Sequence, residues 1–225
     1  MTRCPTSPVK PAAPRVAEFV PQWRAHRLAW PRPANGFSLI EVSIVTAIVL
    51  LIAIIGVPAL GTFVIENKVP KVGEALQRYI THAKTNAQGS GPTPYAGVHT
   101  GLLAQALRGS SVIAVTGEGA SASVAHGLGG KGQAGHGTLT LAPAAVGEGG
   151  AGSAFTLTAT HVNDAACPTL AAVLQRMADI ISVEGKGGGV VVKDATSIPA
   201  QPYDAARAQE QCSAGDANTF VFTVR

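Results

Sequence analysis

The longest hydrophobic segment of the chain lies near its N-terminal end. The 24 residues from Val42 to Ile65 include no charged side chain, and most of them are Val, Ile, Leu or Ala. A helix rises about 1.5 Å per residue, so this segment would reach about 36 Å, enough to cross a hydrocarbon layer of about 30 Å with some tilt. The pattern therefore predicts a membrane-spanning helix.

Apolar residues continue with helical spacing beyond this segment. They recur at alternating steps of four and three and share one face: Ile65, Val69, Val72, Leu76, Tyr79 and Ala83. The spacing predicts a single helix from Phe37 to about Ala87, whose second half packs on a globular head. Pro58 and Pro70 each remove a backbone donor, so we expect them to bend this helix or melt it locally.

The rest of the chain alternates between short periodic runs and connectors rich in glycine. Strand-like alternation occurs at 111–116, 137–141, 155–160, 190–193 and 219–224. Helical spacing occurs at 102–108, from near Pro168 to Ile181, and at 203–211. Residues 117–153 contain twelve glycines in 37 positions, which is typical of loops and hairpin turns. We expect an α+β head in which the last strand lies centrally in the sheet.

Residues 1–36 differ in composition from everything that follows. They carry six Lys and Arg against one acid, Glu18, together with seven prolines and no apolar periodicity. We expect this leader to be unfolded and to stay on the cytoplasmic side of the membrane. No A-x-A-like site lies directly after the apolar run, where a signal peptidase would need it, whereas a Gly36–Phe37 junction precedes the run. Cleavage at that junction would leave the helix on the mature protein.

The leader also accounts for the basic character of the chain. The full sequence has a net charge of +4 and a pI near 9.2. Without residues 1–36 it has 11 Lys and Arg against 12 Asp and Glu. Composition therefore gives no support for a nucleic-acid-binding surface. The sequence around Gly130 and Lys131 also lacks the pattern of a phosphate-binding loop.

The segment GFSLIEV, residues 36–42, resembles the processing site of type IV prepilins. The resemblance implies cleavage by prepilin peptidase after Gly36, N-methylation of Phe37, and a role in assembly for Glu41. Pro58 falls where the membrane helix of this family commonly has a proline. In the family's filament, the Glu pairs with the new α-amine of a neighbouring subunit, which neutralises a charge buried among apolar helices. The alternative is that Glu41 marks only the cytoplasmic membrane boundary.

Cys167 and Cys212 are the only cysteines outside the leader. Two cysteines in a translocated domain favour a disulfide, which in the loop-entropy model is worth about 4 kcal/mol for a loop of about 45 residues. A metal site would need further ligands at suitable spacing. The histidines are scattered, so we expect surface or loop residues and neither a metal nor a cofactor: His82, His99, His126, His136 and His161.

The second half of the chain resembles the type IVb pilins, the class of toxin-coregulated, bundle-forming and conjugative thin-pilus pilins. In that class one disulfide closes the C-terminal region. The resemblance implies an α+β fold with a long N-terminal hydrophobic helix packed on an antiparallel β-sheet head. It divides the chain into a leader at 1–36, a transmembrane and filament-core helix at 37–64, and the remainder of the helix with the head at 65–225. Phe37 departs from the class, whose mature chains more often begin with Met, Leu or Val.

The implied function is that of a structural subunit of a homo-oligomeric filament and not of an enzyme. The implied partners are prepilin peptidase/methyltransferase, the inner-membrane pilus assembly machinery, and membrane lipid before assembly. The precursor would reside in the bacterial inner membrane and the product in an extracellular pilus, with cell adhesion among its candidate roles. One alternative is a pseudopilin or minor pilin. Another is a membrane-anchored periplasmic enzyme. The sequence shows no nucleophile–base pair and no convergent carboxylates, and this counts against an enzyme.

Overall fold

The computed structural model of the protein describes residues 38–88 and 90–225. The predicted leader and the Gly36–Phe37 junction lie outside these residues. The chain divides into two units, 1–46 and 47–225. The second unit contains the head together with most of the first helix, and the packing described below belongs to it.

The first helix, α1, extends over Leu39–Ala87 and ends where the sequence pattern predicts. Its second half supplies one wall of the core, since Val69, Val72 and Leu76 are almost fully buried. Ile80 is the next fully buried residue of this face, and the predicted position Tyr79 is only partly buried. The helix is continuous through Pro58 and Pro70, and the bends expected at these prolines stay a prediction.

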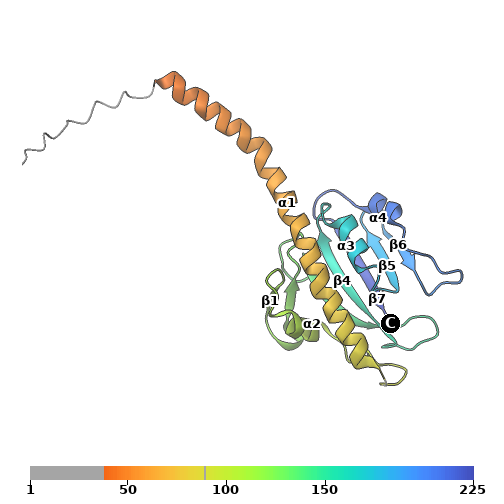
Figure 1. Ribbon diagram of the computed structural model, residues 1–225. Helices are drawn as coiled ribbons and strands as arrows, with labels where there is room; N and C mark the ends of the chain where they lie inside the picture. Colours follow the sequence, from red (N-terminus) through yellow and green to blue (C-terminus); the bar gives the residue numbers. More distant parts are fainter. Residues whose placement is uncertain (1–37, 89) are drawn as a thin grey trace, which may run out of the picture. The chain divides into compact units, whose positions relative to one another are not determined.

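The head is built on one seven-stranded antiparallel sheet in the order β1-β2-β3-β4-β7-β5-β6 (Figure 1). Its strands are β1 Ala114–Thr116, β2 Ser123–Ala125, β3 Thr138–Ala144, β4 Ala154–Val162, β5 Ile180–Glu184, β6 Gly189–Asp194 and β7 Asn218–Val224. The other helices are α2 Thr100–Leu107, the 3-10 turn η1 Gly119–Ser121, α3 Cys167–Leu174 and α4 Ala205–Gln211. This α+β architecture is the predicted one.

The last strand lies in the middle of the sheet, as expected, because it pairs with β4 on one side and β5 on the other. Phe220, Phe222 and Val224 alternate along β7 and are fully buried. Phe222 lies opposite Leu157 of β4 and Ile181 of β5. A row of apolar side chains across three strands thus forms the centre of the core.

One predicted helix is wrong in its second half. The pattern from Pro168 to Ile181 predicts continuous helix, but α3 ends at Leu174. The Leu174 carbonyl accepts hydrogen bonds from the backbone N–H groups of both Met177 and Ala178. Ile180 and Ile181 then begin β5, where pairing with β7 buries Ile181. β-branched residues suit this strand, so sheet pairing overrides the helical spacing.

The glycine-rich segment 117–153 contains more regular structure than its composition suggests. It includes the short strand β2 and all of β3, and β2 joins β1 to the rest of the sheet. The expectation of loops and turns holds for the connections between these strands. The predicted helices at 102–108 and 203–211 are confirmed as α2 and α4, with Asp204 capping α4 through a bond from Arg207 N–H to Asp204 Oδ1.

Candidate functional site

Glu41 lies in the first turn of α1 and its side chain is exposed. A carboxylate at this position is favourable because the N-terminal end of a helix carries partial positive charge. Gly36 and Phe37, the residues of the predicted processing junction, lie outside the described residues. The structure therefore describes the position of Glu41 but not that of its predicted partner, the α-amine of residue 37.

The segment of α1 between Ile48 and Val64 presents large apolar side chains on its surface. Ile54 is 76% exposed, Leu60 65% and Phe63 62%. This helix is long and apolar enough to cross a membrane, and none of its most apolar 18-residue stretch is buried. An exposed apolar surface of this extent requires lipid or other helices to cover it.

The disulfide between Cys167 and Cys212 is present, which confirms the predicted pairing. Cys167 is fully buried in the first turn of α3, and Cys212 follows the last residue of α4. Next to it, the buried Asn218 accepts a hydrogen bond from Ser213 N–H at 2.7 Å and donates to the carbonyl oxygens of Val162 and Ser213. The disulfide and Asn218 together fix the turn that leads into β7.

The second half of α1 packs closely against α3. A Cβ atom added to Gly73 would overlap the side chain of Val173. One turn later, Gln77 Nε2 donates a hydrogen bond of 2.6 Å to the carbonyl oxygen of Val173. Gly73 is therefore a position at which α1 and the disulfide-closed region leave no room for a side chain.

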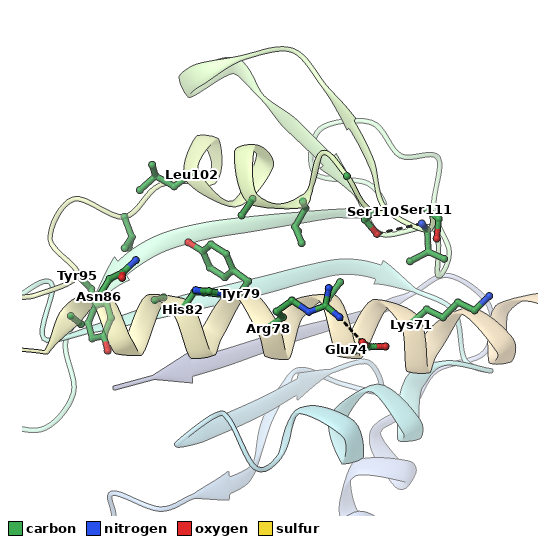
Figure 2. Close-up of a pocket in the computed structure, with 18 of the residues that line it drawn as sticks. Lys71, Glu74, Arg78, Tyr79, His82, Asn86, Tyr95, Leu102, Ser110 and Ser111 are labelled. Carbon is green, nitrogen blue, oxygen red and sulfur yellow. Dashed lines mark hydrogen bonds and ion pairs between the residues drawn. The ribbon is translucent and has the colours of Figure 1, made fainter.

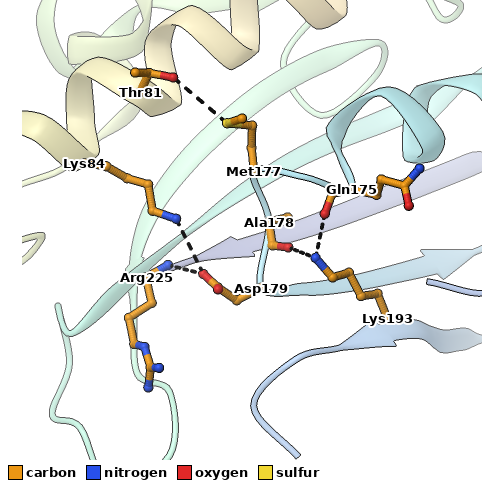
Figure 3. Close-up of polar contacts among 8 residues, drawn as sticks. All are labelled: Thr81, Lys84, Gln175, Met177, Ala178, Asp179, Lys193 and Arg225. Atoms are coloured by element: carbon orange, nitrogen blue, oxygen red, sulfur yellow. Dashed lines mark hydrogen bonds and ion pairs between the residues drawn. The ribbon is translucent and has the colours of Figure 1, made fainter. Parts of the chain in front are cut away.

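A second link joins α1 to the sheet through Asp179 (Figure 3). The Asp179 carboxylate accepts a hydrogen bond of 2.7 Å from Arg225 N–H and lies 4.0 Å from Lys84 Nζ of α1. Nearby, Lys193 Nζ donates to the carbonyl oxygens of Gln175 and Ala178. These contacts connect α1, the end of β7 and the α3–β5 connection.

A groove of about 870 Å³ lies between α1 and the segment that contains α2 (Figure 2). We call it the α1–α2 groove. Tyr79 points from α1 toward α2, and burial raises the pKa of Tyr79 to about 12. The opposite wall carries Tyr95 and Leu102. The groove combines apolar walls with charged residues of α1. The sequence did not predict this groove, because its two walls come from separate parts of the chain.

His126 is a loop residue, as expected, since it follows the last residue of β2, but its side chain is fully buried. Its Nδ1 accepts a hydrogen bond from Leu128 N–H at 3.0 Å, so Nε2 carries the proton and donates to the Thr160 carbonyl at 2.9 Å. His136 and His161 stack with ring centroids 3.8 Å apart. Within residues 38–88 and 90–225, no group of three His, Cys, Asp or Glu side chains is arranged to hold a metal ion.

A family model described as PilS N terminal matches residues 78–225, about two thirds of the chain. The chain belongs to the PilS family of type IV pilins. Members of this family are structural proteins, so the protein is a pilin-like structural subunit and not an enzyme. The match covers the PilS-family head but not the predicted Gly36–Phe37 junction or the apolar part of α1.

Two solved structures are also similar to this chain. The crystal structure of a type IV b pilin from Salmonella typhi has 23% identity and a TM-score of 0.44, and the match covers 69% of this chain and 96% of that one. The crystal structure of TcpA, a type IV pilin from Vibrio cholerae El Tor biotype, has 14% identity and a TM-score of 0.46, with 71% and 99% covered. A comparison with curated protein sequences gives no match.

Proposed function

We propose that the protein is the subunit of a type IVb-like pilus, cut after Gly36, methylated on Phe37 and polymerised into an extracellular filament. The observation that carries this proposal is the exposed apolar surface of α1 on a chain with a PilS-family head. Membrane lipid would cover this surface in the precursor. Neighbouring α1 helices would cover it in the filament, while the heads form the outer surface.

The proposed division of labour follows the charge pattern of the chain. Residues 1–36 hold the precursor on the cytoplasmic side and are removed, 37–64 span the inner membrane and later form the filament core, and 65–225 carry the head. Prepilin peptidase/methyltransferase acts on the chain first, and the inner-membrane assembly machinery acts on the processed chain.

Glu41 serves assembly in this proposal by pairing with the α-amine of Phe37 on a neighbouring subunit. An unpaired carboxylate at the centre of a membrane helix costs roughly 2.5–3.5 kcal/mol on insertion scales, so a partner of opposite charge favours the assembled state. The exposed position of Glu41 in the first turn of α1 leaves its carboxylate free to reach another subunit.

Two variants separate processing from assembly. Gly36→Val should block leader removal, because we expect the peptidase to require a minimal side chain at the cut, and the chain should keep the mass of the precursor. Glu41→Gln should be processed normally but yield at least several-fold fewer filaments, because the charge pair is lost. Processing is measured by gel mobility and assembly by the amount of sheared surface filament.

Ser43→Ala is the matched control, since Ser43 lies on the same exposed turn and bonds only the Ile40 carbonyl of its own helix. It should form filaments at the wild-type level. Normal filament yield from Glu41→Gln would contradict the charge-pairing role. If wild-type filaments contain the chain only as a rare component, the protein is a minor pilin or a pseudopilin instead.

A further inference from the structure

We propose that, in the filament inferred above, the α1–α2 groove of one subunit receives the loop around Ile198 of a neighbouring copy. This proposal rests on the proposed function and specifies a contact between heads. We call residues 194–204, which connect β6 to α4, the Ile198 loop. Three features of the head carry the proposal: the rigidity of this loop, the lining of the groove, and the positions of both on the sheet.

The Ile198 loop holds an apolar side chain fully in solvent. Ile198 is 100% exposed, the highest exposure among the large apolar residues of the described chain. The base of the loop is closed by two backbone hydrogen bonds between Asp194 and Gln201, of 3.0 and 2.7 Å. An apolar tip on a closed base loses little conformational entropy on binding, which favours its use in a contact.

The loop is also fixed from inside by the Asp194 side chain. Its Oδ1 accepts hydrogen bonds from the backbone N–H groups of Thr196 and Ser197 and from the Thr196 hydroxyl. The Ser197 hydroxyl bonds the Asp194 and Pro199 carbonyls. The bonds to Thr196 lower the pKa of Asp194, so the loop keeps this negative charge near neutral pH.

The α1–α2 groove offers a complementary lining. Its wall at α2 is apolar, with Val98 and the 41%-exposed Leu102. Its wall at α1 carries the cations Lys71 and Arg78 against the single acid Glu74, with which Arg78 forms an ion pair. The Ile198 loop contains two acids and no Lys or Arg. An apolar tip flanked by two acids thus matches an apolar groove whose α1 wall keeps a net positive charge, since Glu74 offsets only one of Lys71 and Arg78.

The two surfaces lie at opposite ends of the sheet. The groove is bounded by residues 109–112, which lead into β1, the first strand in the sheet order, whereas the Ile198 loop follows β6, the last (Figure 1). Because α2 packs on β2 and β3, the groove lies about four strand spacings of 4.8 Å, or about 19 Å, from β6. The loop cannot reach its own groove, so the contact joins different copies. Contact between two different patches is heterologous and builds an open helical array when the rotation does not close.

Cross-linking in filaments tests this contact. Leu102→Cys and Ile198→Cys replace exposed side chains and should not disturb folding. Filaments that contain both single variants, expressed together, should give a cross-linked heterodimer with a short thiol cross-linker. A chain that carries both substitutions should give a ladder of higher oligomers. Each single variant alone should give less than a tenth of the heterodimer signal.

The matched control replaces Ile198→Cys with Ala134→Cys, an exposed position in the β2–β3 connection. Filaments that contain both variants but no heterodimer would overturn the proposal while leaving the pilin function intact. Equal cross-linking of the Ala134→Cys control would overturn it as well, because the contact would then be non-specific. Absence of filaments from the wild-type chain would instead contradict the proposed function itself.

Discussion

At the scale of single residues, buried polar side chains determine how the loops of the head are held. His126 and Asn218 have no exposed surface, yet each is hydrogen-bonded to backbone groups of a different segment. His126 ties β2 to β4, and Asn218 ties β4 to the turn after the disulfide. A buried polar group without partners costs about 1–3 kcal/mol, so these bonds select one loop arrangement over others.

The His126 environment predicts a loss of stability in mild acid. Burial lowers the pKa of His126, although the Thr160 hydrogen bond and the charge of Asp216 oppose this and nearby His161 adds to it. A lowered folded-state pKa means that the neutral ring stabilises the fold fully above its unfolded pKa of about 6.5. That contribution is lost as the pH falls below this value, because protonation of Nδ1 breaks the Leu128 bond.

Thermal unfolding of His126→Gln should therefore show a smaller decrease in Tm between pH 7.5 and pH 5 than the wild-type chain. His82→Gln, at an exposed position of α1, should keep the wild-type dependence on pH. Parallel profiles for wild type and His126→Gln would show that another group causes the acid sensitivity.

Replacing Gly73 with alanine should destabilise the head, although helix propensity alone favours alanine. Alanine in a helix interior is favoured over glycine by about 1 kcal/mol, but a Cβ at this position overlaps Val173. Overpacking of this kind costs about 1–3 kcal/mol, so Gly73→Ala should lower the Tm of the head. Gly61→Ala, in the same helix with no atom near the added Cβ, should not lower it. A raised Tm for Gly73→Ala would contradict the close packing of α1 on α3.

At the scale of elements, the disulfide closes the region from α3 to α4. The bonded cysteines are 45 positions apart, and in the loop-entropy model a closed loop of about 45 residues stabilises the fold by about 4 kcal/mol. Reduction, or replacement of both cysteines with alanine, should make this region the first site of cleavage in limited proteolysis. Reductant added to the double variant is the control and should have no further effect. Unchanged digestion of the reduced wild-type chain would argue against a stabilising bridge.

The elements that could be predicted from the sequence are those whose signal is local. The long apolar run and the alternation of Phe220 and Phe222 in β7 needed no tertiary information. Ile180 and Ile181 fit a helical face and a strand equally well, and their pairing with β7 decides between the two. The pattern missed β2 because it has only three residues and depends on its neighbours β1 and β3.

The candidate sites also divide into those with a local sequence signal and those that depend on tertiary packing. Glu41 and the two cysteines could be identified by their types and spacing, and the disulfide is confirmed. The α1–α2 groove could not be identified, since its walls come from residues 71–87 and 94–112 and exist only once α1 packs on the sheet. The burial of His126 likewise depends on the approach of β4 to its loop.

At the scale of the whole molecule, the chain combines a folded head with a helix whose apolar surface is unfavourable in water. The head has its own core, disulfide and central β7, whereas the large apolar side chains described between Leu39 and Val64 of α1 are exposed. A head of this kind can fold before assembly and remain folded afterwards. In the function proposed above, assembly would only exchange lipid for neighbouring helices around α1, and removal of the basic leader would free the end of that helix.

The most direct test of this account is mass spectrometry of the N-terminal peptide from sheared surface filaments. We predict that this chain is the dominant component, that its first residue is Phe37, and that Phe37 carries one added methyl group. A chain that still begins within residues 1–36, or filaments in which this protein is absent, would contradict the account.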